Sequence, residues 1–159
     1  MTNEQIKEFT LKISQANHSG LMLILHDIEQ IYVEDAKKSH LKGDIDEYLR
    51  YIELAKKTHN ELMDCVNPSD SQGKKVLVIL RFVYKQLVSS GIKREPVDLD
   101  RCMEIMKSIR FCFEKLHEID NEGPVMKNTH QVFAGLTYGR GTLNESIQGT
   151  DYSKRGFKA

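Results

Sequence analysis

The chain has 159 residues, of which 40% are hydrophobic and 29% are charged, and its formal net charge is zero. This length fits one domain of ordinary size with enough apolar material for a core. Zero net charge gives no general attraction to nucleic acid, and the lack of any uncharged apolar run of about 18 residues argues against membrane insertion.

The N-terminal sequence and the cysteines favour a cytoplasmic protein. The opening "MTNEQIKEF" lacks the basic and then apolar order of a secretory signal peptide. Cys65, Cys102 and Cys112 form an odd set without C-x-x-C spacing, which favours buried, reduced thiols. We therefore expect a cytoplasmic location and no disulfide framework.

A short N-terminal segment, residues 1–18, precedes the longer periodic stretches. Its apolar residues Ile6, Phe9 and Ile13 recur at i, i+3 and i+7. This spacing places all three on one face of a helix. We expect a short helix that packs on the rest of the domain.

Four amphipathic stretches then follow in chain order, at about 19–41, 45–66, 74–90 and 98–120. Gly43 suits the end of the first, Asp44 the cap of the second, and "SSG" the end of the third. No stretch alternates with a period of two, so strands are not expected. Long helices with short connections predict an all-α, antiparallel up-down four-helix bundle over residues 1–122.

Each stretch has an apolar stripe that we expect to face the core. In the first stretch the expected stripe is Leu21, Ile24, Leu25, Ile28, Ile31 and Tyr32, and in the third it is Val76, Ile79, Leu80, Val83 and Leu87.

The sequence changes character after the fourth stretch. Residues 123–159 hold six of the ten glycines and no sustained periodic run. These residues predict a mostly disordered tail, and its aromatic side chains leave recognition of a short motif as an alternative.

The helices carry more apolar residues than the core stripes require. On the third helix, Leu77, Tyr84 and Val88 form a second ridge, with Phe82 on the opposite flank. The full set of expected partner-binding residues is Met22, Leu23, Tyr51, Leu54, Leu77, Phe82, Tyr84 and Val88. Such an excess favours a peptide or protein partner. Cover by the N-terminal segment and the tail, or a homodimer, would also account for it.

Catalytic and metal-binding patterns are weak in this sequence. A di-metal bundle needs two Glu-x-x-His motifs and two further glutamates, whereas only Glu114 and His117 have that spacing. The "HLKG" sequence at His40 resembles a phosphotransfer histidine motif, but its Lys and Gly each come one residue early. Helical spacing brings no Ser-His-Asp triad together. We expect no enzyme, metal or cofactor, with phosphotransfer through His40 as the catalytic alternative.

The stretch "QANHSGLMLILHDI" resembles the signature of the flagellar secretion chaperone (FliS) family, T-A-S/N-P-x-x-L-I-x-M-L-Y-D-G. The residues that match are Ala16, Asn17, Leu21, Leu25 and Asp27. The following "KGDIDEYLRYIELAKK" is similar to the next family segment, a lysine-containing turn that opens into a helix. The resemblance covers residues 9 to about 120.

This resemblance implies a cytoplasmic helical bundle that binds the disordered C-terminal segment of flagellin. Such a chaperone prevents premature polymerisation and delivers flagellin to components of the export apparatus. By the same resemblance, Ile6, Phe9 and Ile13 cover part of the client surface until they are displaced. The alternative is a helical adaptor or dimerisation module that binds a folded protein through the ridge of residues 74–90. The sequence leaves the client and the oligomeric state open.

Overall fold

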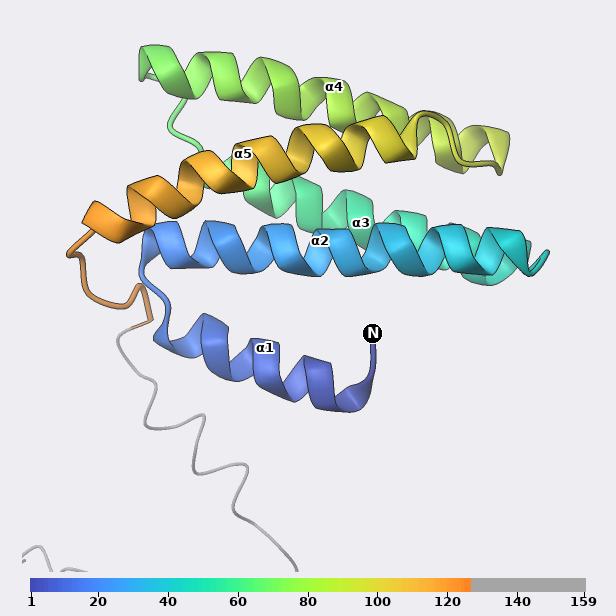
Figure 1. Cartoon of the computed structure of the whole chain (residues 1–159), viewed down its shortest axis with the longest axis horizontal. Coiled ribbons are helices and arrows are strands. Elements are labelled where there is room, and N and C mark those ends of the chain that lie inside the picture. The colour runs from blue at the N-terminus through green and yellow to red at the C-terminus, as the bar shows by residue number, and fades with distance from the viewer. Residues whose placement is uncertain (127–159) are drawn as a thin grey trace, which may run out of the picture. The chain divides into compact units, whose positions relative to one another are not determined.

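A computed structural model describes residues 1–126 and contains five helices and no strand over that range. The helices are α1 (Asn3–Gln15), α2 (His18–Leu41), α3 (Ile45–Asp64), α4 (Ser71–Lys93) and α5 (Leu99–Ile119) (Figure 1). The predicted all-α fold is therefore confirmed, including the short N-terminal helix. The predicted tail lies outside the described residues from residue 127 onward.

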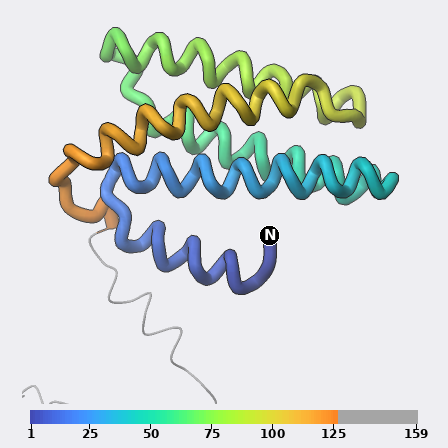
Figure 2. The backbone as a smooth tube through the Cα atoms, viewed as in Figure 1, coloured from blue at the N-terminus to red at the C-terminus, as the bar shows by residue number. Residues whose placement is uncertain are grey.

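Helices α2 to α5 run alternately in opposite directions and form the predicted up-down bundle (Figures 1 and 2). Close backbone approach joins α2 to α3, α3 to α4, α4 to α5 and α5 to α2, so α2 and α4 form one diagonal of the bundle. Helix α1 lies along α2 on the outside, and among the helices of residues 1–126 its backbone approaches no other one closely. Within residues 1–126, no helix combines the length and apolar character needed to cross a membrane.

Short polar side chains begin the helices. Thr2 forms a capping box with Gln5, and the side chains of Asn17, Asp44 and Asp70 accept backbone N–H groups of α2, α3 and α4. These bonds satisfy donors that have no partner inside the first helical turn. The predicted roles of Gly43 and Asp44 are confirmed, since Gly43 has a φ of 75° and Asp44 caps α3.

Helix α4 does not end at "SSG", which corrects the predicted boundary at residue 90. It continues to Lys93, and Arg94 then adopts a left-handed conformation with a φ of 57°. Ser90 is fully buried and serves tertiary contacts instead, because its carbonyl accepts Tyr48 Oη at 3.2 Å and its Oγ accepts the Val97 N–H at 2.9 Å. Ser90, which the sequence predicted to end the helix, therefore links α4 to α3 and to the following loop through hydrogen bonds.

The core-facing side of α2 differs from the predicted stripe. The most deeply buried residues of this helix are Met22, His26, Glu29, Val33 and Ala36, along with three small residues near its ends. The predicted stripe, Leu21, Ile24, Leu25, Ile28, Ile31 and Tyr32, is only half-buried. Because α2 lies between α1 and the bundle, it has apolar residues on two sides, and two polar residues face the core.

On α4 the side that faces the core is rotated about the helix axis, by part of a turn, relative to the predicted stripe. Leu77, Leu80, Val83 and Leu87 are buried, whereas Ile79 is 40% exposed. Leu77 therefore belongs to the core and not to an outer ridge. On or beside α3 the buried apolar residues include Tyr48, Ile52, Ala55 and Val66, and on α5 they are Leu99, Cys102, Met106, Ile109 and Phe113.

Candidate functional site: the α1-covered side of α2 and the outer face of α4

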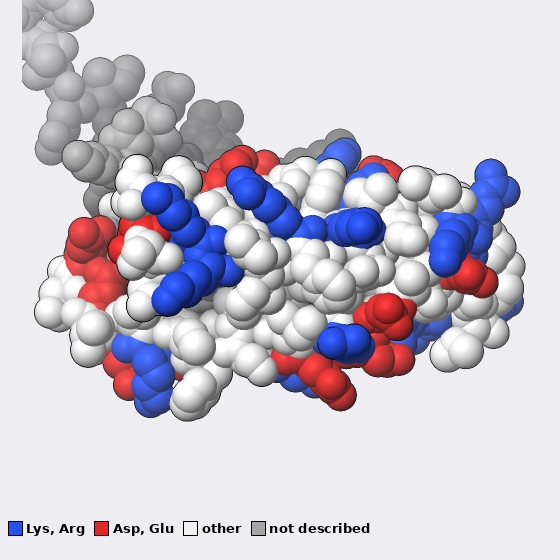
Figure 3. Space-filling model, turned by 90° about the horizontal axis from the view of Figure 1, so that it is seen from above, with Lys and Arg blue, Asp and Glu red and all other residues white. Residues whose placement is uncertain are grey.

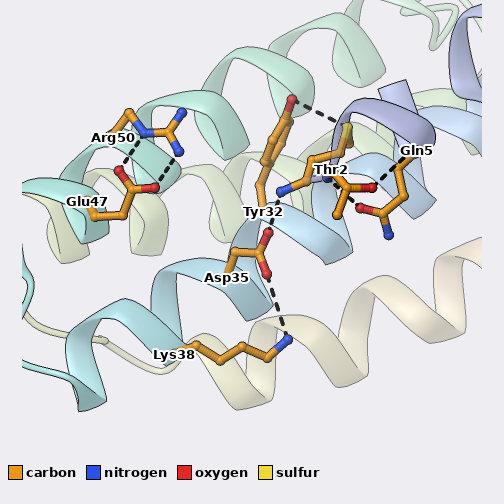
Figure 4. A network of polar contacts seen from close by, with 8 residues as sticks. Thr2, Gln5, Tyr32, Asp35, Lys38, Glu47 and Arg50 are labelled. Carbon is orange, nitrogen blue, oxygen red and sulfur yellow. Dashed lines mark hydrogen bonds and ion pairs between the residues drawn. The ribbon is translucent and has the colours of Figure 1, made fainter. Parts of the chain in front are cut away.

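The Met1 end of α1 contacts the second half of α2. The Met1 ammonium lies 2.7 Å from Asp35 Oδ2, and Tyr32 Oη lies 4.0 Å from the Met1 sulfur (Figure 4). Nearer the other end of α1, Phe9 is buried, with the Lys12 ammonium 5.5 Å from the centre of its ring. One ion pair and one buried aromatic side chain therefore hold much of α1 in place.

The predicted cover residues lie on α1 at different depths. Phe9 is 9% exposed and Ile13 is half-buried, whereas Ile6 is 48% exposed and so does not cover α2 fully. Leu11 is a further apolar side chain of α1 that is 43% exposed. Helix α1 thus has apolar groups on both its docked and its open side.

The residues that match the family signature lie in the α1–α2 turn and along the first half of α2. Ala16 follows the end of α1, and Asn17 caps α2 by accepting the Gly20 N–H at 2.9 Å. Leu21 and Leu25 are half-buried, and Asp27 pairs with Arg110 Nε at 2.7 Å. These positions have clear structural roles in the turn and in the α2–α5 contact.

An open pocket of about 490 Å³ lies at this junction, beside the end of α5. Its lining residues are Lys12, Gln15, Ala16, Asn17, Gly20, Leu23, Ile24, His117, Glu122 and Pro124. The Val125 N–H donates to the Ala16 carbonyl at 2.9 Å, which holds the chain that follows α5 against the α1–α2 turn. Leu23, a predicted partner-binding residue, is among the apolar residues of this pocket.

The other predicted partner-binding residues do not form a single surface. Met22 and Leu77 are core residues, 5% and 8% exposed, because each faces the centre of the bundle; this corrects their expected exposure. Tyr51 is half-buried, and its ring centre lies 6.4 Å from that of Tyr32 on the side near α1. Leu54 of the same helix is also half-buried. Half-buried Tyr84 stacks 6.1 Å from His59, with Val88 one turn later.

The outer face of α4, which we define as Lys74, Lys75, Val78, Arg81, Phe82 and Lys85, is a separate exposed surface. Val78 is 66% exposed and Phe82 is 38% exposed. All four cations are exposed as well. Figure 3, which looks onto the molecule from above, shows several basic side chains across the face in view, with uncharged groups between them and acidic groups nearer its edges.

The centre of the bundle holds a polar cluster that sequence reasoning missed. Glu29 Oε1 lies 2.8 Å from His59 Nδ1, and His59 Nε2 lies 2.8 Å from the Leu80 carbonyl. A carbonyl can only accept, so Nε2 carries a hydrogen, and the Nδ1 contact needs a second proton between the ring and the carboxyl group. The cluster therefore joins α2, α3 and α4 through two hydrogen bonds. The sequence did contain one indication of this burial, because Glu29 has the helical spacing that places it on the same face as Met22, Val33 and Ala36.

His26 lies beside this pair and is 4% exposed. Neither ring nitrogen has a hydrogen-bond partner within residues 1–126, and the ring packs 5.6 Å from Phe113. The pKa of His26 is lowered to about 4, mainly by burial and to a smaller extent by the nearby His59 and Arg110, while Asp27 opposes this shift. The imidazole is therefore neutral at physiological pH.

Ser19, His117 and Asp120 come together at the α2–α5 end of the bundle, although helical spacing predicted no such triad. Ser19 Oγ lies 2.7 Å from His117 Nδ1 and 2.5 Å from Asp120 Oδ2. The serine sits between the other two, so its hydroxyl donates to the carboxylate while His117 donates to the hydroxyl. A catalytic serine instead gives its proton to the histidine. The hydrogen bonds of Ser19 therefore connect the start of α2 to the end of α5, and this arrangement does not activate the serine as a nucleophile.

The remaining chemical candidates stay apart from one another. Within residues 1–126, no group of three or more His, Cys, Asp or Glu side chains could hold a metal ion. His40 packs edge-on, 5.2 Å from Tyr48, at the end of α2. Of the cysteines, Cys102 is buried and burial raises its pKa to about 11, but Cys112 is exposed, contrary to the expectation of three buried thiols.

Residues 1–126 thus define an all-α bundle with an extra helix packed on one side. No protein-family model matches the chain, and neither curated proteins nor solved structures show a match.

Proposed function

We propose that the protein is a flagellar export chaperone that binds the C-terminal segment of flagellin in the cytoplasm. The observation that carries the proposal is α1, an amphipathic helix whose backbone approaches only α2 among the described helices. The client's own amphipathic segment would take the place of α1 on this side of α2. Binding, rather than catalysis, would then be the activity of this site.

The α1-covered side of α2 has the composition that such a client needs. Tyr32 contacts Met1 and shares a helical face with Leu21, Leu25 and Ile28, all of them half-buried. Tyr51, which packs on Tyr32, extends this apolar side onto α3. An amphipathic helix recognises such a surface through apolar residues at i, i+3, i+4 and i+7.

Removal of α1 would leave the bundle's core in place. Apart from Phe9, every buried hydrophobic residue within residues 1–126 belongs to α2–α5 or lies next to them in sequence. A client can therefore displace α1 at the cost of its local contacts alone. The client would also lose conformational entropy on folding, so apolar burial must supply most of its affinity.

The test is a calorimetric titration of the full chain with the last 40 or so residues of flagellin from the same organism. We expect one-to-one binding with a dissociation constant below about 1 µM. Phe9→Asp should tighten binding severalfold, because it frees the covered surface before the client arrives. Leu11→Asp, on the open side of α1, is the matched control and should leave the affinity unchanged.

A second pair of variants tests the client side of the surface. Leu54→Asp on α3 should weaken binding at least tenfold, whereas Glu53→Ala, next to it and exposed, should not. The proposal fails if neither the full chain nor the Phe9→Asp variant binds flagellin while circular dichroism shows that the helices remain.

A further inference from the structure

We infer that the outer face of α4 is a docking site for a second partner: an amphipathic helical segment whose apolar stripe is flanked by Asp and Glu. The inference rests on this face alone and does not depend on the flagellin proposal. It combines two exposed apolar side chains, Val78 and Phe82, with four exposed cations.

The charge of α4 is unlike that of the rest of the bundle. Residues 71–93 hold five basic residues and no acidic one, whereas the remainder of residues 1–122 holds 13 basic and 21 acidic residues. The positive charge is thus confined to one helix of a domain that is otherwise acidic. Such a local field attracts a partner of opposite sign and orients it during encounter.

The cations of this face are not used inside the domain. Among residues 1–126, the ion pairs and side-chain hydrogen bonds involve none of Lys74, Lys75, Arg81 and Lys85. Arg81 and Lys85 are also like charges at i, i+4, and the two lysines lie near the positive end of the α4 dipole, so both arrangements oppose folding. Structural stability alone does not account for this pattern.

The spacing defines the shape of the partner. Lys75, Val78, Phe82 and Lys85 follow one another at i, i+3, i+7 and i+10, so they form one row along the helix with an apolar centre and a cation at each end. A helix laid along this row would place two or more apolar side chains on Val78 and Phe82. Carboxylates on either side of its stripe would meet the cations.

Other occupants fit this face less well. Residues 123–159 hold five basic and two acidic residues, so their charge has the same sign as α4. A helix that lies on a membrane buries a broad apolar face, whereas α4 buries its broad face in the bundle and leaves Val78, Ile79 and Phe82 exposed among the cations. An acidic segment satisfies both the apolar row and the cations.

The experiment uses the full chain and a designed helical peptide of about 18 residues, with Leu and Phe on one stripe and Glu on the flanks. A second peptide has Lys in place of every Glu, and a third has the first composition without the stripe. We expect fluorescence anisotropy to show binding of the first peptide only, weakened severalfold between about 50 and 200 mM salt.

Two variants place the peptide on the protein. Arg81→Glu combined with Lys85→Glu should weaken binding at least tenfold, and Phe82→Ser should weaken it severalfold. Lys57→Glu, an exposed cation of α3, is the matched control and should change affinity little. Circular dichroism of each variant verifies that the helices are retained.

Several outcomes would overturn the inference. These are equal binding of all three peptides, an equal loss with Lys57→Glu, sedimentation with phosphatidylserine vesicles in place of peptide binding, or a Phe82-dependent dimer in analytical ultracentrifugation. If flagellin binds but the acidic peptide does not, this inference fails while the proposed function stands. If the acidic peptide binds but flagellin does not, the proposed function fails while this inference stands.

Discussion

Glu29 of α2 and His59 of α3 form a hydrogen-bonded pair in the centre of the bundle, with Oε1 and Nδ1 2.8 Å apart and side chains 3% and 0% exposed. His59 also donates to the Leu80 carbonyl of α4. The pair therefore specifies how three helices meet, in a region where apolar side chains alone would allow alternative rotations. Glu29 Oε2 has no partner within residues 1–126, so the pair is not fully satisfied.

Removing one member of this pair should lower the free energy of unfolding far more than removing both. We expect His59→Leu to lower the free energy of unfolding by about 3–5 kcal/mol, because it leaves the Glu29 carboxyl group buried without its partner. The double variant Glu29→Met with His59→Leu should be close to the parent protein, since both polar groups are then replaced by apolar ones. Urea denaturation followed by circular dichroism measures all three proteins.

The Glu29→Met single variant completes the double-mutant cycle. A cycle with additive effects would contradict the pairing, because residues in direct contact show coupling energies of about 0.5–3 kcal/mol.

His26 should make the stability depend on pH. The folded protein keeps this imidazole neutral down to a pKa of about 4, whereas the unfolded chain binds the proton near 6.5. Protonation therefore favours the unfolded chain, so the contribution is fully present above pH 6.5 and is lost as the pH falls toward 4. The full effect is about 3 kcal/mol, measured as the free energy of unfolding at several pH values.

The variant His26→Leu isolates this residue from all others that titrate. Its free energy of unfolding should fall less than that of the parent between pH 7 and pH 4.5. Since the leucine also removes two ring nitrogens without partners, the variant should be at least as stable as the parent at pH 7. Identical pH profiles for the two proteins would show that His26 is not buried in the neutral form.

The two glycines of α4 should respond to alanine in opposite ways. At Gly91 an added Cβ would meet only Ile52 Cγ2, at an ordinary 3.5 Å, so Gly91→Ala should stabilise the helix by about 0.5–1 kcal/mol. At Gly73 the same atom would lie 2.1 Å from the Asn67 carbonyl oxygen, so Gly73→Ala must push the preceding loop away and should destabilise the protein. Thermal unfolding of the pair compares them directly; a higher melting temperature for Gly73→Ala would contradict the loop geometry.

Phe9→Asp should release α1 while the bundle stays folded. The aspartate cannot remain buried against α2 without a partner, so the helix detaches and uncovers apolar groups there. We expect faster tryptic cleavage at Lys7 and Lys12 and stronger binding of the dye ANS, with the main unfolding transition shifted little. Leu11→Asp is the control on the exposed side, and loss of the main transition in Phe9→Asp would show that α1 belongs to the core.

The helices and most of their ends could be predicted because the signals are local. Asn17, Asp44 and Gly43 act through bonds or backbone angles within a few residues of themselves, which a single sequence displays. Ser90 shows the limit, since its contacts with Tyr48 and Val97 depend on the packing of α3, α4 and the following loop. The same residue type ends a helix elsewhere, and only the tertiary partner distinguishes the two cases.

The face of α2 could not be predicted because hydropathy ranks His26 and Glu29 as outward-facing. Each is buried here, Glu29 by virtue of a partner 30 positions away in the chain. The partner-binding set failed at Met22 because α2 is packed on two sides, so not every apolar residue outside the predicted stripe is exposed. It failed at Leu77 because the buried side of α4 is turned relative to the predicted stripe. The exposure of Phe82, in contrast, followed from its position opposite the buried side of α4.

Among the described helices α1 packs on α2 alone, which has a consequence for hydrogen exchange. Since the α2–α3, α3–α4 and α2–α5 contacts do not involve α1, this helix can open without the rest of the molecule. Its amide hydrogens should exchange through local opening, at a lower free energy than amides at the centre of α3, whose exchange requires global unfolding. The bundle would therefore carry two levels of protection in one short chain, and the difference between them measures how firmly α1 is held.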